Sequence, residues 1–403
     1  MIGFSGGARW GINENRLQAV GMDVGQINPD IYDGTTYWML LAICLGVPLA
    51  GVATTLSVVR LVRSRAMKLR TTIHDARILV LSRALFLGGI AWILGRILVG
   101  LGEPIGTILG AWGDSLEIHY EVRVRVMNLL SEQEMGLVYS GLLTLFTVPL
   151  YYALIVRKNS RAWLEVSIWF VLYSLLGLFL VQKLLISFAL LVVGLCIVTA
   201  GNVLRHWKLL MVVVGVFFSL IYFAMRNKVA DWSLTTTFEQ VIFRVADGYP
   251  YAMSLGQRHS FSATQYWVGS LVGRPGFLGE PADYNIRIFD MMFPTQKGAA
   301  ALSAPVWSYC DVGWSGVAVT MALIAALSGL AGMIGRYVEQ SVWAWALYIL
   351  ILLQLYHLTQ IPFIGVFMWS YGAPYGILVL LFLAIAVGWF KLRSKSSVQV
   401  KAN

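Results

Sequence analysis

The sequence KVADWSLTTTFEQVIFRVADGYPYAMSLGQRH, Lys228–His259, opens the longest polar stretch of this 403-residue chain, which continues to about Ala304. Apolar runs long enough to cross a bilayer, at roughly 20 residues per crossing, lie on both sides of it. The sequence therefore predicts that residues 228–304 form a large loop on a membrane surface. If the chain has an active site, we expect it in this loop, closed from below by the surrounding helices.

Composition places the chain among multi-pass membrane proteins. Of its residues, 58% are hydrophobic and 12% are charged, and its mean hydropathy is +0.72, whereas roughly a quarter of the residues in soluble domains are charged. The net charge of +10 does not indicate nucleic-acid binding, because membrane proteins collect Lys and Arg on cytoplasmic loops. Cys44 and Cys196 fall inside apolar runs, which argues against a disulfide framework or a Cys-based metal site.

The expected fold is an all-α bundle of about nine spans, forming a single integral membrane domain over residues 1–403. Basic clusters after the first and third runs and in the C-terminal tail mark those ends as cytoplasmic, so residues 228–304 should lie outside. Arg83 and Arg96 fall within the second run and must find partners or water. The spans are expected at Thr36–Val59, Ile78–Leu101, Gly136–Val156, Trp163–Val181, Leu184–Val203, Leu209–Met225, Asp311–Arg336, Val342–Ile361 and Pro374–Phe390.

The polar loop carries groups suited to binding an anion. Thr236-x-x-Glu239 is typical of a capping box and predicts a helix that runs to about Met253. Arginines on glycine-punctuated backbone suit bidentate contact with phosphate oxygens. The alternatives are contact with lipid headgroups and, for Arg244, a bridge to Asp247. The candidate anion-binding residues are Arg244, Arg258, Arg274 and Lys183.

Lys183 belongs to this set because of its place in the chain. It lies at the tip of a short predicted hairpin between the fourth and fifth spans, where its ammonium must stay at the outer interface. From there it could reach an anion held under the large loop, although snorkelling to lipid phosphates is an equal alternative.

The loop also offers bases, but no metal site. The candidates for a general base are His259, Asp247, Asp283 and Glu280. The five histidines are scattered, and Glu280 with Asp283 is the one close acidic pair in the loop. A DxD pair, which would hold a divalent ion on a sugar nucleotide, is absent from the sequence. We therefore expect chemistry without a metal or another cofactor.

This layout resembles that of the Wzy-type oligosaccharide repeat-unit polymerases, which are relatives of the O-antigen ligases. The stretch PVWSYCDVGWSG, Pro305–Gly316, is similar to the aromatic entry to the span that follows the large loop in such enzymes. The spacing from Arg258 to Gly269 fits the Arg-x10-Gly pattern of some members. Ser308 departs from the family, in which an acidic residue often precedes the tyrosine.

The resemblance implies an enzyme at the periplasmic face of the bacterial inner membrane. It would move a growing glycan from undecaprenyl diphosphate onto the next lipid-linked repeat unit, with loop cations stabilising the leaving diphosphate and a loop base activating the acceptor hydroxyl. The implied partners are the lipid-linked oligosaccharide, membrane lipid and a chain-length regulator protein.

Two alternatives remain open. An O-antigen-ligase-like transferase would use lipid A core as its acceptor. A transporter or flippase of lipid-linked sugars would depend on charges buried in spans, and Arg83 and Arg96 favour that interpretation. The sequence does not identify the sugars, the linkage or the base.

Overall fold

A computed structural model describes residues 22–27, 76–101, 105–113, 116–157, 160–200, 203–226, 233–238, 248–258, 284–294, 303–358 and 372–400. Within these ranges every regular element is helical, which confirms the predicted all-α class. The chain divides into two compact units. Unit 1 comprises Met1–Ala66, Val229–Met333 and Leu353–Met368, and unit 2 comprises Met67–Lys228, Ile334–Leu352 and Trp369–Asn403.

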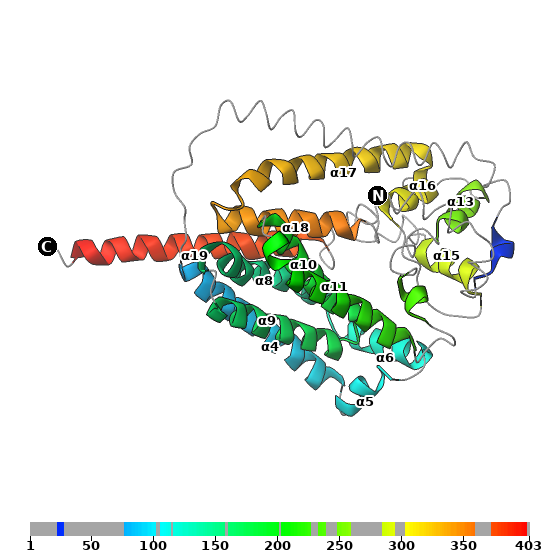
Figure 1. The fold of residues 1–403 in the computed structure, drawn as a ribbon, viewed down its shortest axis with the longest axis horizontal. Coiled ribbons are helices and arrows are strands. Elements are labelled where there is room, and N and C mark those ends of the chain that lie inside the picture. Colours follow the sequence, from blue (N-terminus) through cyan, green and yellow to red (C-terminus); the bar gives the residue numbers. More distant parts are fainter. Residues whose placement is uncertain are drawn as a thin grey trace. The chain divides into compact units, whose positions relative to one another are not determined.

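The helices of both units appear in Figure 1. Unit 2 contains α4 (Ala76–Leu101), α5 (Ile105–Gly110), α6 (Leu116–Asn128), α7 (Glu132–Gly136), η3 (Leu137–Gly141), α8 (Leu142–Tyr151), η4 (Tyr152–Arg157), α9 (Ser160–Phe179), α10 (Lys183–Thr199), α11 (Val203–Arg226), η6 (Gly335–Tyr337), most of α18 (Val342–His357) and α19 (Ala373–Val400). Unit 1 contains η1 (Val24–Gln26), α13 (Tyr249–Arg258), α15 (Tyr284–Met292), α16 (Ala304–Val312), nearly all of α17 (Trp314–Ile334) and the last turns of α18.

Several helices are apolar and long enough to cross a membrane. In the described part of the chain there are four of them, Arg77–Gly100, Glu132–Arg157, Ser160–Phe179 and Trp314–Tyr337. Shorter apolar helices cover Leu185–Thr199, Val214–Phe223, Val342–His357 and Ala373–Gly388. Each coincides with a predicted span, and the predicted span Thr36–Val59 lies outside the described residues.

The run from α7 through η4 forms the centre of unit 2. In its apolar window, 94% of the residues are buried, against 22–39% in the other three long apolar helices. Its path is irregular, because η3 and η4 are π-helical turns and Pro149 lies inside α8. Such wide turns are rare in α-helices and are frequent at functional sites.

Ion pairs between helix ends show in which direction neighbouring helices of unit 2 run. Arg83 near the start of α4 binds Glu165 near the start of α9, and Arg96 near the end of α4 binds Glu134 in α7. Helices α4 and α9 therefore run in the same direction, and the central run is opposed to both. We call the end with Arg77, Arg157 and Arg161 the basic end, and the end with Glu134, Gln182 and Lys183 the hairpin end.

The predicted loop helix differs from the observed one. We expected one helix from Thr236 to about Met253, but the cap is Ser233, whose Oγ accepts a hydrogen bond from the Thr236 amide at 3.0 Å. A short helix covers 234–238, and Gly248 forms a turn before α13. Pro250 explains the restart at this point, since proline fits the first turn of a helix, where its missing N–H costs nothing.

The seventh predicted span also begins later than expected. We placed its start near Asp311, but α16 ends at Val312 and α17 begins at Trp314. Gly313 separates them with φ 73° and ψ −151°, a conformation that is accessible essentially to glycine alone. The aromatic entry motif therefore forms a separate helix that is joined to α17 by a glycine break.

Candidate functional site

Of the eight predicted site residues, two lie in described helices, where the structure places their backbone. Arg258 is the last residue of α13 and Lys183 is the first residue of α10. The remaining six lie outside the described residues: Arg244, Asp247, His259, Arg274, Glu280 and Asp283. The grouping and the roles of these eight residues therefore stay predictions.

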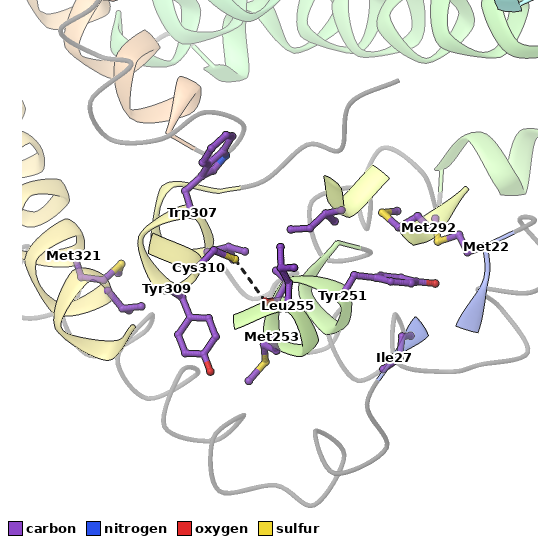
Figure 2. Packing of buried hydrophobic residues seen from close by; sticks show 14 residues of the cluster. Met22, Ile27, Tyr251, Met253, Leu255, Met292, Trp307, Tyr309, Cys310 and Met321 are labelled. Atoms are coloured by element: carbon purple, nitrogen blue, oxygen red, sulfur yellow. Dashed lines mark hydrogen bonds between the residues drawn. The ribbon is translucent and has the colours of Figure 1, made fainter. Parts of the chain in front are cut away.

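Helix α13 gives Arg258 a firmly packed support. The residues Tyr251 to Leu255 are buried in a core shared with α15, α16 and α17. The Cys310 thiol donates to the Ala252 carbonyl across a 3.5 Å contact, which links α16 to α13 (Figure 2). The predicted phosphate ligand thus ends a helix that is anchored in the core of unit 1.

The motif Pro305–Gly316 builds the other wall of this core. Ser308 in α16 and Thr320 in α17 share a buried hydrogen bond between their hydroxyls, 2.5 Å apart, across the Gly313 break. Tyr309 packs edge-on against Trp314. Burial raises the pKa of the Tyr309 hydroxyl, and the neighbouring Cys310 adds to the shift. Tyr309 therefore stays protonated near neutral pH.

Residues from the N-terminal tail complete the same core. Met22 and Ile27 are buried in the same core as Met292 of α15, and the Asp23 amide donates to the Met292 carbonyl at 2.8 Å. Figure 2 shows Met22 beside Met292. The sequence did not predict this contact, because a six-residue segment with a single 3₁₀ turn carries no periodic signal.

The hairpin before Lys183 has a strained tip. Gln182 donates its amide to the Gly177 carbonyl, and Val181 donates its amide to the Leu178 carbonyl, which is the bonding of a Schellman motif. Val181 occupies the left-handed position with φ 54°, where a β-branched residue is a rare outlier. The predicted short hairpin is confirmed, and its tip is held in a conformation that valine alone would not favour.

Side-chain hydrogen bonds explain how this tip is maintained. The Tyr139 hydroxyl, from the π-helical turn η3, donates to Gln182 Oε1, and Gln182 Nε2 contacts the Met127 sulfur at 2.9 Å. The Tyr173 hydroxyl donates to the Val138 carbonyl at 2.9 Å in the same turn. Contacts from the π-helical turn, α6 and α9 thus hold the three residues before α10 in place. No local sequence signal predicted the Tyr139–Gln182 pair.

Both arginines of the second predicted span have carboxylate partners, in line with the prediction that they must find partners or water. Arg83 binds Glu165 through two parallel bonds, Nε to Oε1 at 2.6 Å and Nη2 to Oε2 at 2.7 Å. Arg96 Nε lies 3.1 Å from Glu134 Oε1, which also accepts from the Trp92 indole at 2.9 Å. These contacts join α4 to α9 and to α7.

The side chains that could bind a metal ion are dispersed over the described ranges. These ranges contain no group of three or more His, Cys, Asp or Glu residues that could hold a metal ion. The close acidic pair Glu280 and Asp283 lies outside these ranges.

The fold and the contacts described above define the class of protein by its architecture. The protein is all-α in its described part, with several apolar helices able to span a membrane and a second unit that packs part of the polar segment around α13, α15 and α16. Comparison of the chain with protein-family models, with curated proteins and with solved structures gives no match.

Proposed function

We propose that this protein polymerises undecaprenyl-diphosphate-linked oligosaccharide repeat units in polysaccharide or lipopolysaccharide synthesis. A hydroxyl of the acceptor sugar forms the new glycosidic bond, and the bond from the donor sugar to its diphosphate breaks. The hydroxyl proton passes to a base, and undecaprenyl diphosphate leaves with the bonding electron pair. The resemblance to Wzy-type polymerases supports this choice of a glycosyltransferase.

One observation carries the proposal. Helix α11 packs on α10 as an antiparallel neighbour, so it returns to the hairpin end and finishes there at Arg226. Arg226, the last residue of α11, therefore lies at the end of unit 2 where Lys183 begins α10, and the predicted loop starts two residues later in the sequence. A catalytic loop and a cation on the same membrane face are what a lipid-diphosphate transferase requires.

The proposed roles follow the chemistry of each side chain. Guanidinium and ammonium groups stabilise charge that develops on the leaving diphosphate, and we assign this role to Arg244, Arg258, Arg274 and Lys183. The base is one of His259, Asp247, Asp283 and Glu280. The basic end faces the cytoplasm and the hairpin end faces the periplasm. A chain-length regulator protein is the proposed protein partner.

The ion pairs of the second span bear on the transporter alternative. Arg83 and Arg96 each meet a carboxylate, so they resemble structural crosslinks rather than free charges along a transport path. A ligase that uses lipid A core as its acceptor would share the loop chemistry. The product of a reconstituted reaction separates it from a polymerase, because only a polymerase elongates lipid-linked repeat units in the absence of lipid A core.

Removing divalent metal ions should leave turnover unchanged. Cations held by the protein can neutralise a leaving diphosphate as a bound ion does, and the loop supplies three arginines for this purpose. Purified protein reconstituted with lipid-linked repeat units should elongate them equally well with and without excess EDTA. A loss of polymer under EDTA that Mg²⁺ or Mn²⁺ restores would contradict the arginine-based mechanism.

Breaking the Arg83–Glu165 pair should harm stability but not chemistry. Glu165→Gln leaves the Arg83 guanidinium without its carboxylate between two apolar helices, at a cost on the order of 2 kcal/mol. The double variant Arg83→Leu/Glu165→Leu removes both charges and should approach wild-type stability and activity. Thermal unfolding in detergent and polymer formation measure the two effects. A stable but inactive double variant would support the transporter alternative instead.

A further inference from the structure

A cluster of buried polar side chains in unit 1 belongs to none of the groups assigned above. Gln354 and His357 lie three residues apart, on one face of α18, and are 2% and 5% exposed. Ser303, which precedes α16, is 3% exposed. We call these three residues the α16/α18 polar cluster. Ionisable or hydrogen-bonding groups inside apolar helices are usually functional, because their burial is costly.

A backbone hydrogen bond brings the members of this cluster near one another. The Ala304 amide donates to the Leu358 carbonyl at 2.8 Å, and the Leu358 amide donates to the Gln354 carbonyl at 3.1 Å. Ser303 and Gln354 therefore flank the same junction, within about one helical turn of it. Partly buried apolar side chains pack around this junction: Leu323, Ile324, Leu327 and Leu355.

Two members of the cluster, Ser303 and Gln354, have side-chain polar atoms without hydrogen-bond partners in the described part of the chain. Among the residues that the structure describes, neither Oε1 nor Nε2 of Gln354 has a hydrogen bond, and Ser303 Oγ has none. An unsatisfied buried group of this kind costs roughly 1–3 kcal/mol, and native proteins keep few of them. The contrast with Gln182 is direct, since that glutamine is equally buried and has both amide atoms in contact with Tyr139 and Met127.

We propose that the α16/α18 polar cluster binds a neutral hydroxyl group of the sugar in the lipid-linked oligosaccharide. A hydroxyl can donate to Gln354 Oε1 and accept from Gln354 Nε2 or Ser303 Oγ. Gln354 and Ser303 carry no charge and so suit a sugar better than a diphosphate. The surrounding leucines suit the C–H groups of a sugar. This inference rests on the proposed function and adds a site that recognises the glycan rather than its leaving group.

The test uses Gln354→Leu in the full-length protein, purified into lipid nanodiscs. The probes are the lipid-linked repeat unit from the cells that make this protein and undecaprenyl diphosphate without sugar. Affinity for the repeat unit should fall about tenfold, as for one lost buried hydrogen bond, while affinity for the sugar-free lipid stays the same. The melting temperature without ligand should rise by a few degrees, because an unsatisfied polar group has been removed.

Gln182→Leu is the matched control, since it removes a satisfied buried glutamine and should lower the melting temperature. Unchanged repeat-unit affinity of Gln354→Leu, or an equal loss for both lipids, would overturn the inference. So would a fall in its melting temperature, which would identify Gln354 as a structural group satisfied by buried water. The wild-type protein could bind the sugar-bearing lipid more tightly, lose that preference in Gln354→Leu and yet form no polymer. That result would refute the polymerase function but support the sugar-binding site.

Discussion

Replacing Arg258 with lysine is expected to reduce polymer formation about hundredfold, although the variant keeps its positive charge. A diphosphate presents paired oxygens, which a planar guanidinium meets through two parallel bonds, whereas an ammonium is a point charge. Losing such a contact in a partly desolvated site costs on the order of 3 kcal/mol in the transition state. The initial rate of elongation of purified lipid-linked repeat units measures this effect.

The structure makes this substitution a clean test. Arg258 ends α13, and the buried residues Tyr251 to Leu255 hold that helix in the core of unit 1. Lysine favours helices almost as well as arginine, so the variant should fold normally. Arg287→Lys, at an exposed position of α15 with no proposed role, is the matched control and should keep full activity. An Arg258→Lys enzyme that makes full-length polymer at the wild-type rate would remove Arg258 from the site.

Gly376→Ala is expected to destabilise unit 2 by about 2 kcal/mol, as for an overpacked core. A Cβ at this position would lie 2.7 Å from Ser140 Oγ and from Thr144 Oγ1, and 2.9 Å from Leu350 Cδ1. The Gly376 amide also donates to Ser140 Oγ at 3.0 Å, so α19 cannot move away without losing that bond. Thermal or denaturant unfolding of the purified protein gives the free energy of unfolding.

The same helix supplies the control for this change. Gly388 in α19 would meet no atom within 4 Å if it carried a Cβ. Gly388→Ala should therefore gain up to about 1 kcal/mol from helix propensity alone. The difference between the two variants isolates the close approach of α19 to η3 and α8. Equal stability of both variants would show that α19 lies farther from η3 and α8 in solution.

The apolar helices were predictable because each is an apolar run of adequate length, and this signal is local. The hairpin of α9 and α10 and the need for partners at Arg83 were read correctly on this basis. Glu165, which supplies one such partner, lies 82 residues away along the chain. Pairs of this kind, including Tyr139 with Gln182, depend on packing between helices that no single run encodes.

Local sequence signals gave wrong predictions where two of them competed. Thr236-x-x-Glu239 has the residues of a capping box, but Ser233 has a hydroxyl three residues earlier and takes the cap. Gly313 in the entry motif resembles any other glycine in sequence, yet its φ of 73° ends one helix and starts another. The predicted site residues lie almost entirely outside the described part of the chain, so their grouping still depends on the resemblance and on chemistry.

The bond between Asp23 and Met292 constrains how many times the chain can cross the bilayer. Segments that touch outside the membrane lie on one side of it, so an even number of crossings must separate them. Between these two residues the described apolar helices are α4, the α7–η4 run, α9, α10 and α11, which is an odd number if each crosses once. Parity then requires one further crossing, and the sequence offers Thr36–Val59 for it. A single amide in the tail thereby favours the predicted first span, and with it the prediction that the tail lies on the same side of the bilayer as the polar loop.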